Sequence, residues 1–261
     1  MPTAVPTAHV PKLDHAIMAH RGLPTKAPEN TMASFRSAAA AGADWVEMDV
    51  DILADGTPIV MHDSWLDRTT NKSGRFYDLE VSDLEGIDAG SWFSSEFAGE
   101  PIPTLREFID FLNESGMNAN IEIKGNEQGA ARSQQLVDSV LTELKRLDPT
   151  RQMMISSFSQ PILIRVSELA PQYALAVLFD KTSFGPDWLS VLEMCGASYA
   201  NLEDDGLTPE TVRQVTDAGF GVNVWTVNRT DRAKELFKWG CTSMITDVAD
   251  RMVDAQLGAG S

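Results

Sequence analysis

The chain has 261 residues, of which 43% are hydrophobic, and its formal net charge at pH 7 is −17. This size and composition suit one large α/β domain or two small ones, and they exclude a disordered chain. The negative charge argues against nucleic acid or an anionic membrane surface as a partner, so any anionic substrate must be met by locally placed cations.

Residues 1–14, rich in proline, threonine and alanine, predict a loose N-terminal arm. The arm has neither the charged start nor the apolar run of a signal peptide, and no segment approaches the ~20 apolar residues that span a bilayer. Cys195 and Cys241 are too few for a disulfide framework, so we expect two reduced thiols. We therefore expect a cytoplasmic protein without stable membrane association.

The first predicted strand, residues 16–19, is short and apolar and leads into His20-Arg21-Gly22. Pro28-Glu29-Asn30-Thr31 then opens a helix, with Asn30 or Thr31 as the N-cap and Gly42 at its end.

The next stretch, residues 45–63, is predicted to be a strand with strict alternation, followed by a hairpin return. Glu47, Asp49 and Asp51 share one face of the strand, and apolar residues take the other. Asp55-Gly56 is a strong turn signal, and a connection this short returns antiparallel. If these two residues form the whole turn, paired residue numbers sum to 111 and His62 lies directly opposite Asp49.

Residues 64–103 are rich in aromatic residues and long for a barrel connection, so we expect an inserted subdomain with its own small core. A capping box at Thr104 and Glu107 then starts a helix that ends at Gly116. Strands and helices alternate from there on. The further predicted strands are 119–124, 152–156, 175–179, 198–202, 221–227 and 243–246, and the further helices are 130–146, 159–169, 186–194, 208–219, 230–239 and one from about 248.

Without the antiparallel return at 58–61, this pattern gives eight strands, each followed by a helix. Eight such units in about 250 residues are typical of a (β/α)8 TIM barrel, here with a small insertion after the second strand. We therefore predict a single domain over residues 1–261.

Catalytic residues of such barrels come from the C-terminal ends of several strands. Reading those ends gives His20, Arg21, Glu47, Asp49, His62, Glu122, Lys124 and Trp225. Each has an ordinary structural explanation when taken alone: a local ion pair, a loop cap or a core residue. Their convergence at one rim favours a functional site.

Three carboxylates in one place repel one another unless a cation joins them, and all-oxygen ligands favour Mg²⁺ or Ca²⁺. Two histidines can exchange protons near neutral pH, and Arg21 and Lys124 supply fixed positive charge. This set suits a phosphate ester that reacts by in-line displacement. The chain has no glycine-rich phosphate cradle, so a nucleotide kinase or dinucleotide enzyme is not expected.

The sequence resembles the glycerophosphodiester phosphodiesterases, particularly the cytosolic bacterial type, almost throughout from residue 16. The motifs that carry the resemblance are His20-Arg21-Gly22, Pro28-Glu29-Asn30-Thr31, Glu47-x-Asp49, Asp55-Gly56, His62-Asp63, Arg68-Thr69-Thr70, Asp88-Ala89-Gly90-Ser91-Trp92, Ile102-Pro103-Thr104-Leu105, Ile121-Glu122-Ile123-Lys124, Val224-Trp225-Thr226-Val227-Asn228 and Ile245-Thr246-Asp247.

The resemblance implies one divalent ion held by Glu47, Asp49 and Glu122. It also implies that His20 is the base and His62 the acid, that Arg21 and Lys124 bind phosphate, and that Trp225 packs on the glycerol moiety. Asp51 is an additional acid, expected to be a solvated strand residue or to enter the outer shell of the metal.

We therefore expect metal-dependent hydrolysis of small-molecule glycerophosphodiesters to glycerol 3-phosphate and an alcohol. One alternative is the same barrel acting on a lysophospholipid or other phosphodiester, which would need an apolar rim and exposed Trp65, Phe93 and Phe97. The other is a non-catalytic glycerophosphodiester-binding protein. The head group, the choice between Mg²⁺ and Ca²⁺, the oligomeric state, and cyclic-phosphate formation versus direct attack by water stay open.

Overall fold

The computed structural model describes residues 13–257, so the predicted arm over residues 1–14 lies almost wholly outside the described residues. The strands are β1 (Ala16–His20), β2 (Trp45–Ile52), β3 (Pro58–Val60), β4 (Asn118–Ile123), β5 (Met153–Ser157), β6 (Ala174–Phe179), β7 (Tyr199–Glu203), β8 (Gly221–Trp225) and β9 (Ser243–Thr246). The α-helices are α1 (Met32–Ala40), α2 (Leu105–Ser115), α3 (Ala130–Leu144), α4 (Gln160–Leu169), α5 (Trp188–Met194), α6 (Pro209–Asp217), α7 (Thr230–Trp239) and α8 (Ala249–Asp254).

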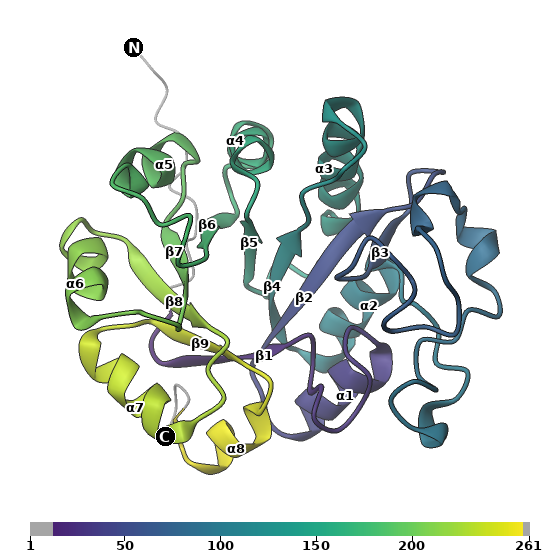
Figure 1. The fold of residues 1–261 in the computed structure, drawn as a ribbon, viewed down its shortest axis with the longest axis horizontal. Helices are drawn as coiled ribbons and strands as arrows, with labels where there is room; N and C mark the ends of the chain where they lie inside the picture. Colours follow the sequence, from purple (N-terminus) through teal and green to yellow (C-terminus); the bar gives the residue numbers. More distant parts are fainter. Residues whose placement is uncertain (1–12, 258–261) are drawn as a thin grey trace.

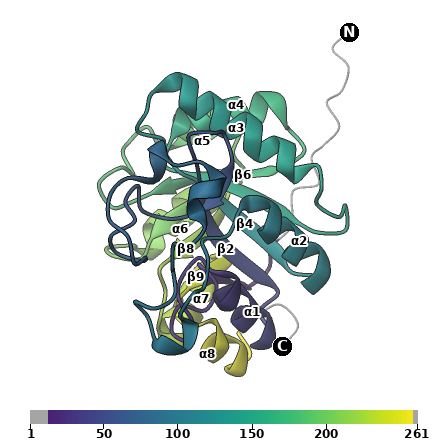
Figure 2. The ribbon, with the colours of Figure 1, turned by 90° about the vertical axis from the view of Figure 1, so that its right-hand side faces the viewer.

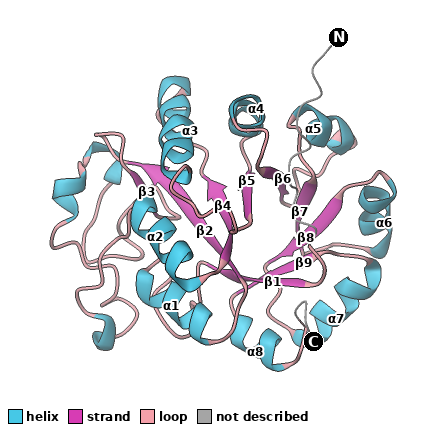
Figure 3. Cartoon of the chain, turned by 180° about the vertical axis from the view of Figure 1, so that it is seen from behind, coloured by secondary structure: helices cyan, strands magenta, loops and turns pink. Residues whose placement is uncertain are grey.

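The sheet closes on itself. Its order is β1-β9-β8-β7-β6-β5-β4-β2-β3, and β1 also pairs in parallel with β2. Of the strands that the structure describes, only β3 is antiparallel, and it extends the sheet beyond β2. The helices surround the closed strands (Figures 1 and 3). The predicted (β/α)8 TIM barrel is therefore confirmed.

Alternation along each strand separates two cores. On β2, Val46, Met48 and Val50 belong to the large core shared with the surrounding helices. A second cluster, drawn almost wholly from the strands, contains residues such as Met18, Met154 and Tyr199 and fills the barrel interior. The polar residues of β2 lie on the same inward face as this second cluster. They therefore reach the end of the barrel where the strands terminate.

Local signals place the starts of three helices where the sequence predicts them. Thr104 caps α2, its hydroxyl accepting from the backbone N–H of Glu107, while the Glu107 carboxylate accepts from the N–H of Thr104. Thr31 caps α1, and Thr208 caps α6 with Pro209 at its first position. Cys195 and Cys241 are buried, unpaired thiols.

The predicted hairpin register is wrong by one residue. Val50 pairs with Val60 and Asp51 with Ile59, so paired numbers sum to 110, and the N–H of Met61 donates to the backbone oxygen of Asp49. The turn holds three residues because the Asp55 carboxylate accepts from the Thr57 N–H and Gly56 adopts a φ of +91°. His62 follows the end of β3, so its position is decided by the loop beyond the ladder.

Residues 61–104 lie beside β3, at the right of Figure 1 and facing the viewer in Figure 2. They contain three short 3-10 helices, η1 (Phe76–Asp78), η2 (Val81–Leu84) and η3 (Ser95–Phe97). Leu66, Phe76 and Ile102 are among the members of a third apolar cluster, separate from the two barrel cores. Within residues 13–257, no helix combines the length and the apolar character needed to cross a bilayer.

Candidate active site

The eight sequence-predicted site residues come together at the C-terminal end of the barrel. Six of them line a pocket of about 250 Å³. The other two contact members of that six, Asp49 through Arg21 and Lys124 through Glu122. The lining residues are His20, Arg21, Glu47, His62, Asn120, Glu122, Ser156, Phe158, Leu178, Trp225, Thr226 and Ile245. They arise from strands spread over the whole chain, and parallel alignment of those strands brings them to one rim.

Three buried carboxylates form the centre of the site. Glu47, Asp49 and Glu122 each offer an oxygen, and these oxygens lie within 4.8 Å of one another. Burial, with repulsion from the neighbouring acids, raises the pKa of Glu47 well above its usual value and the pKa of Glu122 to about 7. An all-oxygen donor set whose charges repel in the absence of a cation fits a hard divalent ion.

Asp49 is the best stabilised of the three. Burial alone would raise its pKa, but Lys124 and Arg21 hold the pKa below its usual range. Asn30 donates from Nδ2 to Asp49 Oδ2 over 2.8 Å and adopts a φ of +55°, a conformation that asparagine tolerates better than most residues.

Two cations lie against this cluster. Lys124 Nζ is 2.7 Å from Glu122 Oε1 and 3.2 Å from Asp49 Oδ1. Arg21 Nε is 3.3 Å from Asp49 Oδ2. Burial would lower the pKa of both cations, yet the surrounding carboxylates raise both values above normal, so each stays charged.

The turn after β1 aims its residues into the pocket. Arg21 has a φ of +55°, and its backbone N–H donates to Glu47 Oε2 over 3.1 Å. Gly22 follows at a φ of +90°, where a Cβ atom would lie 2.4 Å from Ser34 Oγ and 2.6 Å from a backbone carbon of Ser34. Only glycine lets this turn pack so closely on α1.

Each histidine is held at Nδ1 by an aspartate. His20 Nδ1 is 2.7 Å from Asp247 Oδ1, and His62 Nδ1 is 2.6 Å from Asp63 Oδ1. In both rings the aspartate contacts Nδ1 and does not engage Nε2. His20 Nε2 lies 3.9 Å from Glu47 Oε2. Burial, together with Lys124 and Arg21, lowers the pKa of His62 despite the attraction of Asp49.

Arg68, from the segment after β3, ties two further acids together. Its guanidinium donates twice to Glu29, at 2.8 Å each, and twice to Asp63, at 2.6 and 3.1 Å. Glu29 in turn accepts from Arg21 Nη1 over 2.8 Å. The chain Arg21–Glu29–Arg68–Asp63 thus connects the turn after β1 with the partner of His62.

Aromatic side chains form one wall of the pocket. Trp225, at the end of β8, donates from Nε1 to the backbone oxygen of Asn201 over 3.1 Å. Its ring meets Phe158 edge to face, with centroids 5.7 Å apart. The indole is therefore fixed in orientation while one side of it lines the pocket.

Asp51 departs from expectation. It is 3% exposed, so it is not a solvated strand residue, and it is absent from the carboxylate cluster. Its oxygens accept from Tyr77 Oη at 2.8 Å and from Asn126 Nδ2 at 2.9 Å. Asp51 therefore links β2 to the inserted segment and to the loop after β4.

The sequence pattern assigned no catalytic, binding or metal-ligating role to several residues that the structure places in or beside the site: Glu29, Asn30, Asp63, Arg68, Asn120, Ser156, Phe158 and Asp247. Five of these fall in motifs that carried the family resemblance. Asn120 was detectable by alternation, because it lies two positions before Glu122 on the same face of β4.

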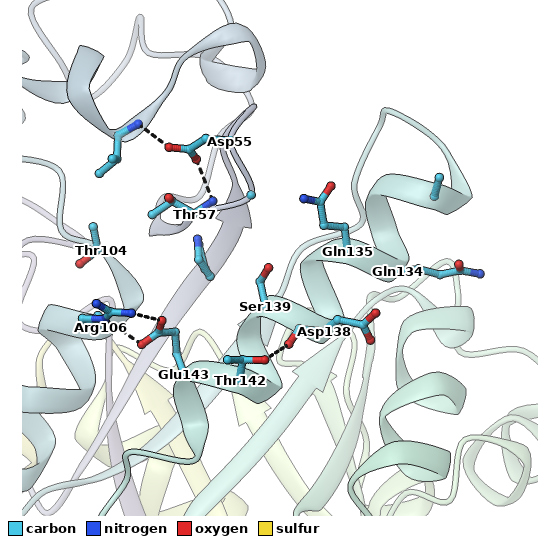
Figure 4. A pocket seen from close by; sticks show the side chains of 14 residues that line it. Asp55, Thr57, Thr104, Arg106, Gln134, Gln135, Asp138, Ser139, Thr142 and Glu143 are labelled. Atoms are coloured by element: carbon cyan, nitrogen blue, oxygen red, sulfur yellow. Dashed lines mark hydrogen bonds and ion pairs between the residues drawn. The ribbon is translucent and has the colours of Figure 1, made fainter.

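A larger groove of about 680 Å³ lies between the β2–β3 turn, the start of α2 and α3 (Figure 4). Its charged side chains are already paired. Arg106 makes two hydrogen bonds to Glu143, Asp55 accepts from the Thr57 and Val81 N–H groups, and Asp138 pairs with Arg165. The chemistry therefore belongs to the smaller pocket at the strand ends.

The pocket at the strand ends is that of an enzyme acting on phosphate esters, since its cations can offset phosphate charge and imidazole groups are able to exchange protons near neutral pH. The model of the glycerophosphoryl diester phosphodiesterase family matches residues 20–251. The chain therefore belongs to this family, as its motifs predict, and the expected phosphodiesterase identity is confirmed.

Similar proteins and solved structures also belong to the phosphodiesterases. A glycerophosphodiester phosphodiesterase of Caldanaerobacter subterraneus is 32% identical over 242 residues, covering 91% of this chain and 96% of the relative. A phosphodiesterase of Oleispira antarctica, solved in complex with the product sn-glycerol-3-phosphate, is 30% identical with a TM-score of 0.88, covering 92% of this chain and 96% of that one. A glycerophosphodiester phosphodiesterase of Agrobacterium tumefaciens is 26% identical with a TM-score of 0.75, over 92% and 99% of the two chains.

Proposed function

We propose that this protein hydrolyses small-molecule glycerophosphodiesters to glycerol 3-phosphate and an alcohol, using one divalent ion, Mg²⁺ or Ca²⁺. The observation that carries the proposal is the cluster of Glu47, Asp49 and Glu122, whose buried oxygens lie within 4.8 Å of one another beside the two histidines. The product bound by the Oleispira relative supports the substrate class.

The ion would be held by Glu47, Asp49 and Glu122. When bound, it would neutralise charge on the phosphate oxygens and acidify a nearby hydroxyl. Arg21 and Lys124 would bind the phosphate itself. Arg21 has a planar fork that matches two phosphate oxygens, and Lys124 adds a point charge.

In the mechanism we propose, the 2-hydroxyl of the glycerol attacks phosphorus and gives its proton to Nε2 of His20. The bond from phosphorus to the alcohol oxygen breaks, and Nε2–H of His62 protonates that oxygen. Water then opens the cyclic phosphate, with the histidines acting in reverse. Direct attack by water is the alternative, and it uses the same two nitrogens.

The aspartates that hold Nδ1 support these roles, since each fixes its ring so that Nε2 is the nitrogen left for proton transfer. The two histidines follow different strands, β1 and β3, which suits attack and departure on opposite sides of phosphorus. The lowered pKa of His62 makes its protonated form a stronger acid.

The lysophospholipid alternative is less well supported. It needs an apolar rim made by Trp65, Phe93 and Phe97. Of these three, only Trp65 is exposed, and Arg75 stacks over its ring at 5.2 Å. Phe93 and Phe97 pack against each other with centroids 5.6 Å apart.

The test is hydrolysis of a panel of glycerophospho-alcohols by metal-stripped protein to which Mg²⁺ or Ca²⁺ is added back. We expect release of glycerol 3-phosphate only with metal, for at least one alcohol. Tight binding of the diesters without turnover under every metal would favour the non-catalytic alternative. Preferred cleavage of a lysophospholipid would favour the lipid alternative. The cytoplasmic location stays a prediction.

A further inference from the structure

Two polar side chains, Asn120 and Ser156, line the pocket, and we call them its floor. Asn120 lies on β4, two residues before Glu122 on the same inward face, and its Cα pairs with that of Glu47. Ser156 lies on the neighbouring strand β5, where its Cα pairs with that of Glu122. Both residues line the pocket, beside the carboxylate cluster.

Both side chains are buried with an unmet polar atom. Asn120 is 1% exposed and Ser156 is 0% exposed. Among the described residues, neither Asn120 Oδ1 nor Ser156 Oγ has a hydrogen-bond partner. Burying such an atom unpaired destabilises a protein, so its retention in a pocket indicates a ligand group that pairs with it.

Nearby polar residues show the contrast. Ser157, the next residue on β5, is equally buried, but its hydroxyl donates to the Ile123 backbone oxygen over 2.6 Å and accepts from the Ser159 N–H. Asn223, inside the barrel, donates to Asn201 over 2.8 Å. Asn201 Nδ2 is also unpartnered among the described residues, but Asn201 does not line the pocket.

The two unmet atoms match a hydroxyl. Asn120 Oδ1 only accepts, whereas Ser156 Oγ can donate, and a hydroxyl placed between them can donate to the first and accept from the second. As diagonal neighbours on adjacent strands, the two side chains can both reach such a group. The walls beside them are apolar (Phe158, Leu178, Trp225 and Ile245) and suit the carbon atoms of a short polyol.

We propose that Asn120 and Ser156 bind the terminal hydroxyl of the substrate's glycerol, and that this contact selects glycerol diesters with that hydroxyl free. The inference rests on the proposed function. The 2-hydroxyl must lie at His20 to react, so the terminal hydroxyl, one carbon further on, reaches the floor. At about 250 Å³ the pocket is smaller than the ~300–1,000 Å³ of drug-sized sites, and this size suits a short polyol.

The experiment compares glycerophosphocholine with 2-hydroxypropyl phosphocholine, which keeps the attacking hydroxyl and lacks only the terminal one. The parent protein should prefer glycerophosphocholine by on the order of 10²-fold or more in kcat/KM, because the analogue leaves both floor groups unpaired. Ser156→Ala and Asn120→Leu should each reduce this ratio at least about tenfold. Ser157→Ala is the matched control and should keep the parent ratio.

Thermal melting separates this role from a structural one. Ser156→Ala should melt no lower than the parent because it removes an unpaired hydroxyl, whereas Ser157→Ala should melt lower because it removes a paired one. A parent ratio near one, or equal losses on both substrates in Ser156→Ala, would overturn the proposal.

A binding measurement keeps the result separate from the proposed function. Calorimetry should give a lower Kd for glycerol 3-phosphate than for 2-hydroxypropyl phosphate, and Ser156→Ala should bring the two values together. If the parent hydrolyses neither diester, the proposed function fails, and the two Kd values still decide the role of the floor. Equal Kd values for the parent would refute it.

Discussion

His20 and Asp247 are 227 positions apart, yet His20 Nδ1 lies 2.7 Å from Asp247 Oδ1. The second oxygen of Asp247 accepts from Asn228 Nδ2 over 2.7 Å, which fixes the carboxylate in turn. Closure of the barrel through the β1–β9 pairing brings these two residues, which follow the first and last strands of the sheet, side by side. The orientation of the proposed base therefore depends on the last strand of the fold.

Asp247→Asn should keep the shape of this contact but change which group donates. A carboxylate accepts from Nδ1–H, whereas an amide can donate to an unprotonated Nδ1 and so stabilise the tautomer with the proton on Nε2, which cannot act as a base there. We expect kcat for a choline diester to fall roughly 10²-fold with little change in KM. Steady-state kinetics check this. Asp250→Asn on α8, whose carboxylate lies 4.0 Å from Lys26, is the control and should retain parent activity. Parent kcat in Asp247→Asn would show that this contact does not orient the base.

His62→Ala should separate substrates by their leaving groups. We expect loss of about 10²–10⁴-fold for a choline or ethanolamine diester, whose alkoxide needs a proton. A nitrophenyl diester should be largely spared, because its leaving group needs none. His20→Ala should depress both. Equal losses on the two substrates in His62→Ala would mean that the histidine roles are exchanged or absent.

Arg68→Lys tests whether the Glu29–Arg68–Asp63 connection positions His62. Lysine is a single point charge and cannot make the four hydrogen bonds that the guanidinium makes. We expect kcat for the choline diester to fall about tenfold or more. Arg106→Lys is the matched control, since Arg106 also makes a two-bond contact, to Glu143, on the outside of the barrel. Similar losses in both variants would point to stability alone.

Glu122→Gln should abolish activity with either metal while the fold is retained. The substitution removes one of the three charges of the cluster, and a neutral amide is a weaker ligand for a hard cation. Loss of turnover with a circular-dichroism spectrum and melting temperature near those of the parent is the expected result. Full activity in this variant, or in stripped protein under chelator, would falsify the metal assignment.

Metal affinity should fall on acidification through neutral pH. In the metal-free site, burial and the charge of Asp49 raise the pKa of Glu122 to about 7. Above pH 7 the carboxylate is ionised and free to bind, whereas below pH 7 a proton competes with the ion. Calorimetry from pH 8 to pH 6 should show weakening Mg²⁺ or Ca²⁺ binding. In two buffers of different ionisation heat at pH 6.5, it should also show proton release. Affinity that is flat across this range would contradict the shift.

The sequence by itself determined the barrel and the eight side chains predicted at its rim. Eight apolar strands, each followed by a helix, have few ways to bury both faces, and parallel strands bring their C-terminal ends to one edge. Residues such as Glu47 and Glu122, read only as strand-end acids on an inward face, therefore meet in space as predicted. Local signals such as the Thr104–Glu107 capping box act within one helical turn, so the helix start that they mark can also be predicted from the sequence.

The tertiary structure alone decided between turn types that the residue pattern leaves open, and it alone decided what depends on non-local contacts. The predicted hairpin register was wrong by one residue because the Asp55 side chain and Gly56 form a three-residue turn. The dipeptide Asp55-Gly56 by itself does not distinguish a three-residue turn from a two-residue one. From the sequence, Asp51 was expected to be solvated. In the structure, the inserted segment places Tyr77 beside Asp51, and the Tyr77 hydroxyl donates a hydrogen bond to it. The unmet atoms of Asn120 and Ser156 appear only once every neighbouring strand is in place, because hydrogen-bond satisfaction is a property of the packed interior and not of the residue.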